Sequence, residues 1–358
     1  MDKAKLEELA PILLKLTSNE NLTLEESRKA FNLTGDYDET GLFFTALVTG
    51  LMAKGPTVDE ILGFCLDRKD RIGSLKVSVS PENAIDLSGG GGDKIKSVNV
   101  STLAAFVCAA GGLTVAKQAA TAFTGYLGSS DILNELGIGI PTDTIDEKRI
   151  KTALETTNFV AYNYASLAPK RFVNYLRWRK LVVESGLKIF IPQHIASFAY
   201  SPIQMGNRIY GLASSKYMRL LAEVLQRLGH KNVLVVHGVD GLDEISNVGP
   251  TKVVEVRGSA IKEYELTPQN FGVEKVKVAD IKIENKEESK KQFLEVLRGE
   301  GKREIQDLVA INAGAAFYLT GKRKSYKEGT KFALELLKSG KVGEKLLEVV
   351  AFYKQNRG

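Results

Sequence analysis

The stretch DLSGGGGDKIKSVNVST, residues 86–102, decides the fold. Its four consecutive glycines, Gly89–Gly92, have no side chains, so the backbone can adopt positive φ angles and approach a ligand closely. The apolar run Leu103–Ala110 follows and predicts a buried helix with Ser101 or Thr102 near its N-cap. A glycine loop and a helix N-terminus both offer peptide N–H groups, which suit a polyphosphate. The alternative is a flexible linker, but linkers are rarely followed by a capped, apolar helix.

The segments around this loop alternate between strands and helices. A short strand leads from Ala84 into the glycines, and residues 113–116 predict a second strand after the buried helix. This order indicates the βαβ unit of a parallel sheet, and hence an α/β fold. Residues 164–206 give no consistent prediction beyond helical spacing over 171–183. The other predicted elements are helices at 129–137, 147–156, 217–228, 287–299, 303–320, 327–338 and 342–354, strands at 159–161 and 233–236, and a hairpin of 253–257 and 261–266 around Gly258 and Ser259.

Residues 1–75 predict a helical module without strands. Leucines recur at helical spacing near the N-terminus, and Thr23 with Glu26 forms a possible capping box at the next helix start. Thr57 predicts the cap of a further helix after the stop signal Lys54-Gly55-Pro56.

Composition limits the classes of protein that this chain can represent. Its 44% hydrophobic and 26% charged content is typical of a soluble globular protein, and no run approaches the roughly 18 apolar residues of a membrane span. The N-terminus contains acidic residues and helix formers, which argues against a signal peptide. Cys65 and Cys108, both in apolar surroundings, predict free thiols and a cytoplasmic location. The net charge of +6 suits phosphate-bearing ligands but is weak evidence for nucleic acid.

Two further segments carry residues suited to phosphate chemistry. Lys117 is predicted at the end of the strand that contains Val115 and Ala116, where it can meet a ligand anion, although a solvated loop lysine is equally compatible. Asp243 and Glu244 follow a buried strand, and paired carboxylates suit Mg²⁺, although such pairs are commonly surface charge. The single His237 at the same strand end is more typical of a structural hydrogen-bonding residue. The chain contains no nucleophile elbow, Walker loop, Cys/His metal spacing or dinucleotide fingerprint.

Three separated motifs resemble the anthranilate phosphoribosyltransferases, a family with the nucleoside-phosphorylase-like fold. Residues 86–93 and 99–102 resemble the family's D-T-x-G-T-G-G-D and N-x-S-T signatures. Residues 116–121 and 127–137 resemble A-K-H-G-N-R and S-G-S-A-D-x-L-E-x-L-G, and residues 237–246 match H-G-x-D-G-x-D-E-x-S. Weaker similarity covers nearly the whole chain.

The resemblance implies a helical domain of residues 1–75, to which residues 165–205 return, and an α/β domain of residues 76–164 and 206–358 with a mostly parallel sheet flanked by helices. It also implies transfer of 5-phosphoribosyl from 5-phosphoribosyl 1-diphosphate (PRPP) to a nitrogen acceptor with Mg²⁺, in a homodimer formed through the helical domain. The residues implied to bind PRPP are Gly89, Gly91, Gly92, Asp93, Asn99, Ser101, Thr102, Lys117 and Ser129, and those implied to bind metal are Ser101, Asp243 and Glu244.

The departures from the family pattern fall on the acceptor side. The family's His-Gly-Asn-Arg is here Gln118-Ala119-Ala120-Thr121, so the histidine and asparagine that face the aromatic amine are absent. The anthranilate-binding arginine corresponds to Arg177 or Arg179, and the spacing around it differs. A pocket that hydrogen-bonds one acceptor rejects others by factors of about 10⁴ or more, so these changes predict an acceptor other than anthranilate.

Two alternatives remain open on the sequence. A nucleoside phosphorylase shares the fold but uses inorganic phosphate, and the N-x-S-T and D-E motifs favour PRPP instead. A nucleic-acid-binding branch of the family is basic and has lost the glycine and acidic motifs, which are present here. No catalytic acid–base pair is identified, and an amine nucleophile would need only positioning against the ribose carbon and a weak base.

Overall fold

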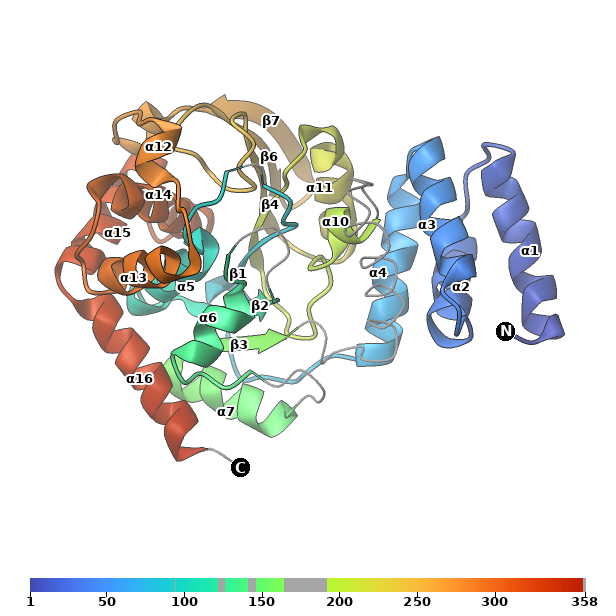
Figure 1. Ribbon diagram of the computed structural model, residues 1–358, viewed down its shortest axis with the longest axis horizontal. Coiled ribbons are helices and arrows are strands. Elements are labelled where there is room, and N and C mark those ends of the chain that lie inside the picture. The colour runs from blue at the N-terminus through green and yellow to red at the C-terminus, as the bar shows by residue number, and fades with distance from the viewer. Residues whose placement is uncertain (94, 122–125, 141–145, 164–191, 357–358) are drawn as a thin grey trace.

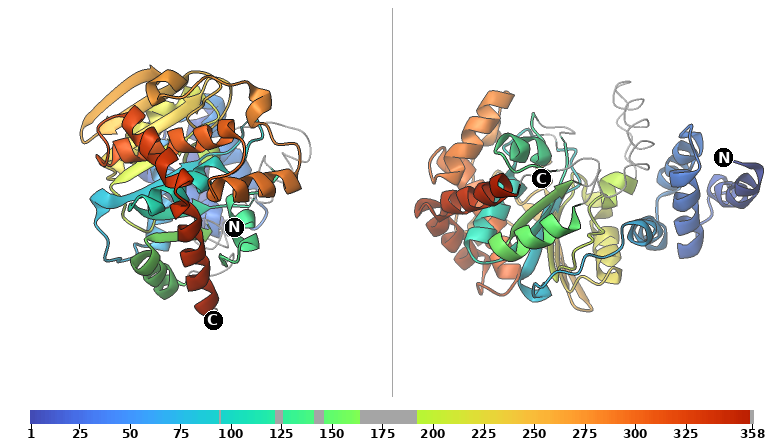
Figure 2. Two further views of the ribbon diagram at one scale, coloured as in Figure 1. Left: turned by 90° about the vertical axis from the view of Figure 1, so that its left-hand side faces the viewer. Right: turned by 90° about the horizontal axis from the view of Figure 1, so that it is seen from below.

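The computed structural model describes residues 1–93, 95–121, 126–140, 146–163 and 192–356. A seven-stranded sheet forms the centre of the larger part of the molecule, and four helices stand beside it (Figure 1). Figure 2 shows from a second direction that these first helices project from the α/β part. The predicted fold class is therefore confirmed.

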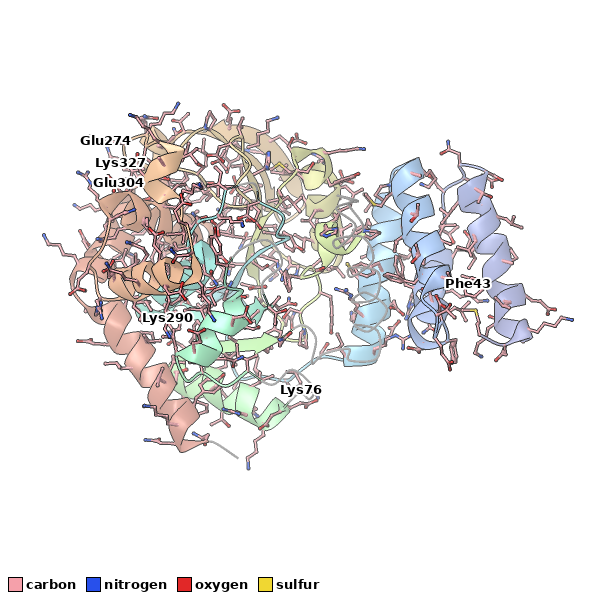
Figure 3. The ribbon with its side chains drawn as sticks, in the orientation of Figure 1. Phe43, Lys76, Glu274, Lys290, Glu304 and Lys327 are labelled. Atoms are coloured by element: carbon pink, nitrogen blue, oxygen red, sulfur yellow. The ribbon has the colours of Figure 1, made fainter. Side chains whose placement is uncertain are left out.

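The N-terminal helices are α1 (Lys3–Thr17), α2 (Leu24–Asp36), α3 (Leu42–Lys54) and α4 (Val58–Ile72). Both predicted caps are confirmed: Thr23 with Glu26 and Thr57 with Glu60 form complete capping boxes. Helix α4 lies nearest the sheet and α1 lies farthest from it (Figures 1 and 2). Phe43 packs from α3 against the core of this module (Figure 3).

The sheet has the strand order β3-β2-β1-β4-β5-β6-β7. The first five strands in this order are parallel, whereas β6 and β7 are antiparallel and form the predicted hairpin. The strand bounds are β1 Ala84–Gly89, β2 Thr114–Ala119, β3 Phe159–Asn163, β4 Asn207–Gly211, β5 Asn232–Gly238, β6 Thr251–Arg257 and β7 Ala260–Leu266.

Helices cover both faces of the sheet. Helices α5 (Val100–Ala110), α14 (Arg303–Leu319) and α16 (Lys341–Gln355) share one core with one face, and α11 (Met218–Arg227) shares another core with the opposite face. The remaining helical segments are η1 Pro81–Asn83, α6 Ser129–Glu135, α7 Glu147–Thr157, α10 Pro192–Ala196, η2 Ser215–Tyr217, η3 Pro268–Phe271, α12 Val278–Ile281, α13 Lys286–Leu297 and α15 Tyr326–Lys338.

The helical module and the sheet are not separated by solvent. Ile195 and Ala199, from the segment that includes α10, lie in the same buried cluster as Leu47 of α3 and Val235 of β5. The described part of the predicted return segment therefore packs where the two parts meet. The proposed domain boundaries themselves remain a prediction.

Two expectations from composition can be compared with the structure. Cys65 and Cys108 are free and buried, as predicted. Among the described residues, no helix combines the length and the apolar character needed to cross a membrane.

Candidate active site

The glycine loop (residues 89–93) leaves the sheet at its topological switch point. Strands β2 and β3 lie on one side of β1, and β4 and β5 lie on the other side. In open α/β sheets ligands bind at the carboxyl ends of the strands where the strand order reverses in this way. A second loop, residues 239–250, follows β5 at the same edge, and we call it the acidic loop because it contains Asp243 and Glu244.

The glycines of this edge are required because the two loops pack against each other. A Cβ atom at Gly89 would lie 2.3 Å from Asp243 Oδ2, and one at Gly90 would lie 2.4 Å from the carbonyl oxygen of His194. A Cβ atom at Gly211, the last residue of β4, would lie 1.4 Å from the carbonyl oxygen of Asp243. These contacts leave no space for a side chain, so Gly89 and Gly211 permit the close approach of the acidic loop, and Gly90 permits that of α10.

Part of the predicted peptide cradle is used within the protein. The N–H of Gly91 donates to Asp243 Oδ2 at 2.9 Å, and the N–H of Gly90 donates to the carbonyl of Gly211 at 2.8 Å. Gly91 and Gly92 have φ angles of +70° and +95°, as expected for a loop of this kind. The glycine loop thus holds the acidic loop as well as offering a ligand surface.

Three carboxyl groups gather between these loops. Burial, followed by the negative charges of Asp243 and Asp93, raises the pKa of Glu244 well above its usual value. Burial and the neighbouring Asp243 likewise raise the pKa of Asp93, and burial raises that of Asp243. Like charges held together in a desolvated place favour the approach of a cation.

The donor set fits a magnesium ion. Glu244 Oε1 accepts a hydrogen bond from the N–H of Ser101 at 3.2 Å, whereas its buried Oε2 has no hydrogen-bond partner among the described residues. Mg²⁺ is commonly held by one or two carboxylates together with water and substrate phosphates. Within the described ranges, no group of three or more His, Cys, Asp and Glu side chains is placed so that it could hold a metal ion by itself. The protein therefore offers a partial site for an ion that a phosphate ligand would complete.

Lys117 lies inside β2 rather than after it, so the predicted position at the strand end is wrong. Its side chain is 2% exposed, and its Nζ donates to the carbonyl of Leu87 at 2.8 Å and to Ser101 Oγ at 3.2 Å. Burial lowers the pKa of Lys117 to about 8, against the attraction of Asp86, Glu244 and Asp243. The lysine reaches the start of α5 from beneath the glycine loop, which excludes the solvated-loop interpretation.

The polar residues Ser101 and Thr102 lie near the N-cap of α5, as predicted. Asn99 is the N-cap residue, although its side chain makes no capping bond, and the helix begins at Val100. Ser101 and Thr102 therefore lie in the first turn. The buried Thr102 Oγ1 has no partner among the described residues, which leaves it available to a ligand or an internal water.

Ser129 begins α6, and its Oγ accepts a hydrogen bond from the N–H of Ala120 at 3.0 Å. Gln118 is 2% exposed, and its Nε2 donates to the carbonyls of Phe198 and Tyr200, both at 3.0 Å. Gln118 thus joins β2 to the segment that follows α10. Arg177 and Arg179 lie outside the described residues.

The sequence did not reveal two buried polar groups of the α/β part. Arg208 in β4 forms an ion pair with Asp86 in β1, and both side chains are fully buried. The other group is Asn312 of α14, which contacts the acidic loop at Ile245. A charged residue inside a predicted buried strand, such as Asp86, is the signal that could have indicated a buried partner. The predicted structural role of His237 agrees with its contact, since its Nδ1 lies 2.8 Å from the carbonyl of Leu212.

Comparison with known proteins agrees with this fold and site. The model of the glycosyl transferase family α/β domain matches residues 81–342, which defines the class of this protein as a glycosyl transferase. The anthranilate phosphoribosyltransferase of Geobacillus kaustophilus is 33% identical over 338 residues, which cover 94% of this chain and 96% of that protein. The chain therefore belongs to the anthranilate phosphoribosyltransferases, a family of phosphoribosyltransferase enzymes.

Solved structures show the same architecture. The crystal structure of anthranilate phosphoribosyltransferase from Thermus thermophilus has a TM-score of 0.84 and 30% identity, with 96% of this chain and 99% of that chain covered. The enzyme from Saccharomyces cerevisiae, in complex with PRPP and Mg, has a TM-score of 0.80 and 20% identity, with 99% of each chain covered. The second likeness concerns the fold alone.

Proposed function

We propose that this enzyme transfers the 5-phosphoribosyl group of PRPP to a nitrogen acceptor other than anthranilate, with Mg²⁺ as cofactor. The observation that carries the proposal is the contact of the glycine loop and the start of α5 with the acidic pair: Gly91 N–H on Asp243 and Ser101 N–H on Glu244. A diphosphate with its magnesium ion can be bound by peptide N–H groups, a cation and carboxylates. One edge of the sheet brings these together as a helix start, a glycine loop, a buried lysine and two carboxylates.

The residues have separate roles in the proposed reaction. Asp243, Glu244 and the Ser101 hydroxyl would hold Mg²⁺, which when bound neutralises charge developing on the diphosphate. The residues proposed to bind PRPP are Gly89, Gly91, Gly92, Asp93, Asn99, Thr102, Lys117 and Ser129. Lys117 is supported in this role by its position, because its ammonium lies within hydrogen-bond distance of Ser101 at the helix start. The amine then requires only correct positioning against the ribose carbon.

The proposal is tested by release of diphosphate from PRPP in a screen of nitrogen acceptors at several Mg²⁺ concentrations. We expect release with at least one acceptor other than anthranilate and only when a divalent cation is present. Phosphate-dependent cleavage of nucleosides would instead support the phosphorylase alternative, and salt-dependent binding of DNA without turnover would support the nucleic-acid alternative.

The acceptor proposal is supported by the two positions that depart from the family pattern. Gln118 donates its amide nitrogen to the carbonyls of Phe198 and Tyr200, so this nitrogen is committed to the protein, while its buried Oε1 has no partner among the described residues. Ala120 presents only a methyl group. Arg177 and Arg179 remain proposals for the acceptor side.

Anthranilate is expected to be a poor acceptor, with kcat/KM below the roughly 10⁴ M⁻¹s⁻¹ that marks the lower end of typical enzymes. The reason is that the site lacks the polar groups that would hydrogen-bond anthranilate, so it has little selectivity for this acceptor. Steady-state kinetics with anthranilate and PRPP measure this value. The variant Ala120→Asn, which restores an amide at this position, is the matched control and should increase turnover of anthranilate. An efficient wild-type reaction with anthranilate would contradict the acceptor proposal.

The affinity for PRPP is expected to decrease as the pH rises through about 8, because burial lowers the pKa of Lys117 to about 8 and the side chain loses its proton there. An anion binds the charged form, so affinity is complete below this pH and decreases by up to about tenfold per pH unit above it. Titration calorimetry at saturating Mg²⁺ over a pH series measures the effect. Lys117→Met should bind PRPP weakly and lack this pH step; an identical step in the variant would assign it to another group.

The remaining parts of the proposal concern assembly and location. A homodimer formed through the helical module is proposed from the resemblance to the family. A cytoplasmic location is proposed from the free, buried cysteines. Nucleic acid is not favoured as a partner, because the glycine and acidic motifs, which the nucleic-acid-binding branch of the family has lost, are present in this chain.

A further inference from the structure

The acidic loop contains neither helix nor strand, so its backbone groups need partners outside regular secondary structure. The side chain of Asn312 in α14, which is 4% exposed, is the partner of both backbone groups of one residue in this loop, Ile245. Its Oδ1 accepts from the N–H of Ile245 at 3.1 Å, and its Nδ2 donates to the carbonyl of Ile245 at 2.9 Å. The side-chain amide therefore pairs with Ile245 as a neighbouring strand would.

The orientation of this amide is fixed by a third contact. Asn312 Nδ2 also donates to the carbonyl of Leu308 within α14, at 2.9 Å. A rotated amide would place its oxygen against two carbonyl oxygens, which is unfavourable. Because α14 packs in the core beneath the sheet, the pairing ties the loop to a rigid element.

The paired residue directly follows Glu244. The Glu244 carboxylate is itself held only at Oε1, by the Ser101 N–H, while Oε2 has no partner among the described residues. The neighbouring Asp243 carboxylate is held separately, by the N–H of Gly91. Because the Glu244 side chain is held at one oxygen, its position depends on how firmly the backbone that carries it is held.

We propose that Asn312 is a positioning residue, which holds the backbone at Ile245 and thereby places the Glu244 carboxylate for metal and diphosphate. The inference rests on the proposed function, and it adds a residue that touches neither metal nor PRPP. Outer residues that orient metal ligands typically contribute about 10–100-fold to metal affinity.

The test compares Asn312→Leu, which keeps the size but loses all three hydrogen bonds, with Thr330→Val. Thr330 is 1% exposed in the adjoining helix α15, packs against Gly314 of α14, and donates its hydroxyl to the carbonyl of Tyr326. This control removes a buried hydrogen bond from the same packing layer without touching the acidic loop contact. PRPP consumption is measured across a Mg²⁺ titration, with melting temperature recorded for each variant.

We expect Asn312→Leu to raise the Mg²⁺ concentration for half-maximal activity by about 10–100-fold. Thr330→Val should keep the wild-type Mg²⁺ dependence even if its melting temperature falls as far as that of Asn312→Leu. If Asn312→Leu does not fold, Asn312→Asp is measured instead; it keeps the acceptor for Ile245 N–H, loses both donated bonds, and should shift the Mg²⁺ dependence in the same direction.

An unchanged Mg²⁺ dependence in a folded Asn312 variant would overturn the inference, as would an equal shift in Thr330→Val. These outcomes differ from failure of the proposed function, in which the wild-type protein itself would not consume PRPP. Binding of Mn²⁺ alone, measured by its electron paramagnetic resonance signal, gives a second readout and should weaken in the Asn312 variant.

Discussion

Replacement of Asp243 by Asn is expected to reduce the rate of PRPP consumption by roughly 10²–10³-fold, the loss typical of one preorganised transition-state contact. The variant removes a negative metal ligand but keeps the side-chain volume. Its amide oxygen can still accept the N–H of Gly91, so the packing of the glycine loop is retained. Repulsion among Asp243, Glu244 and Asp93 also decreases, so the fold should not be destabilised.

The measurement is PRPP consumption by the wild type and Asp243→Asn across a Mg²⁺ titration, with melting temperature as the folding control. Glu263→Gln, an exposed carboxylate on β7, is the matched control for loss of one charge and should behave as the wild type. Added Mn²⁺ should recover part of the activity of Asp243→Asn. An unchanged rate and metal dependence would show that Asp243 holds no metal.

Replacement of Arg208 by Ala is expected to destabilise the protein by about 3–5 kcal/mol, because it leaves Asp86 charged, buried and unpaired. Arg208 also donates from Nη1 to the carbonyl of Ala199 at 2.8 Å, so the variant loses a contact to the segment after α10 as well. The double variant Arg208→Met with Asp86→Leu removes both charges and should recover much of this free energy of unfolding.

Urea unfolding followed by circular dichroism measures these changes. Burial already raises the pKa of Asp86 despite Arg208, and loss of Arg208 raises it further. A raised pKa in the folded state means that the variant gains stability as the pH falls and Asp86 becomes protonated. The deficit of Arg208→Ala should therefore shrink at acidic pH. A deficit below about 1 kcal/mol, or one independent of pH, would contradict this account of the pair.

Local sequence patterns predicted most of the fold. The glycine loop with its apolar helix indicated a parallel βαβ unit, and Gly258 marked the hairpin of β6 and β7. Capping residues located the starts of α2 and α4. Strand β4 was not predicted, because its sequence NRIYG places an arginine in a buried strand. Its ion-pair partner Asp86 lies 122 positions away in the chain, where no local pattern indicates it.

The candidate site was predicted in part. The motifs identified the glycine loop and acidic pair, and the structure brings them together through Gly91 and Asp243. The position of Lys117 was wrong because a lysine normally ends a strand, whereas here Ser101 and the carbonyl of Leu87 satisfy it inside the sheet. The contact between Asn312 and Ile245 joins residues that are 67 positions apart, and no local sequence pattern predicts such a contact.

We propose that the glycine loop and the acidic loop together form a metal-dependent site for PRPP. Calorimetric titration of the wild-type protein with PRPP, in the presence of Mg²⁺ and again with EDTA, tests it most directly. We expect binding at one site per chain with Mg²⁺ and a large loss of affinity in EDTA. Equal affinity in both conditions, or no binding at any Mg²⁺ concentration, would contradict it.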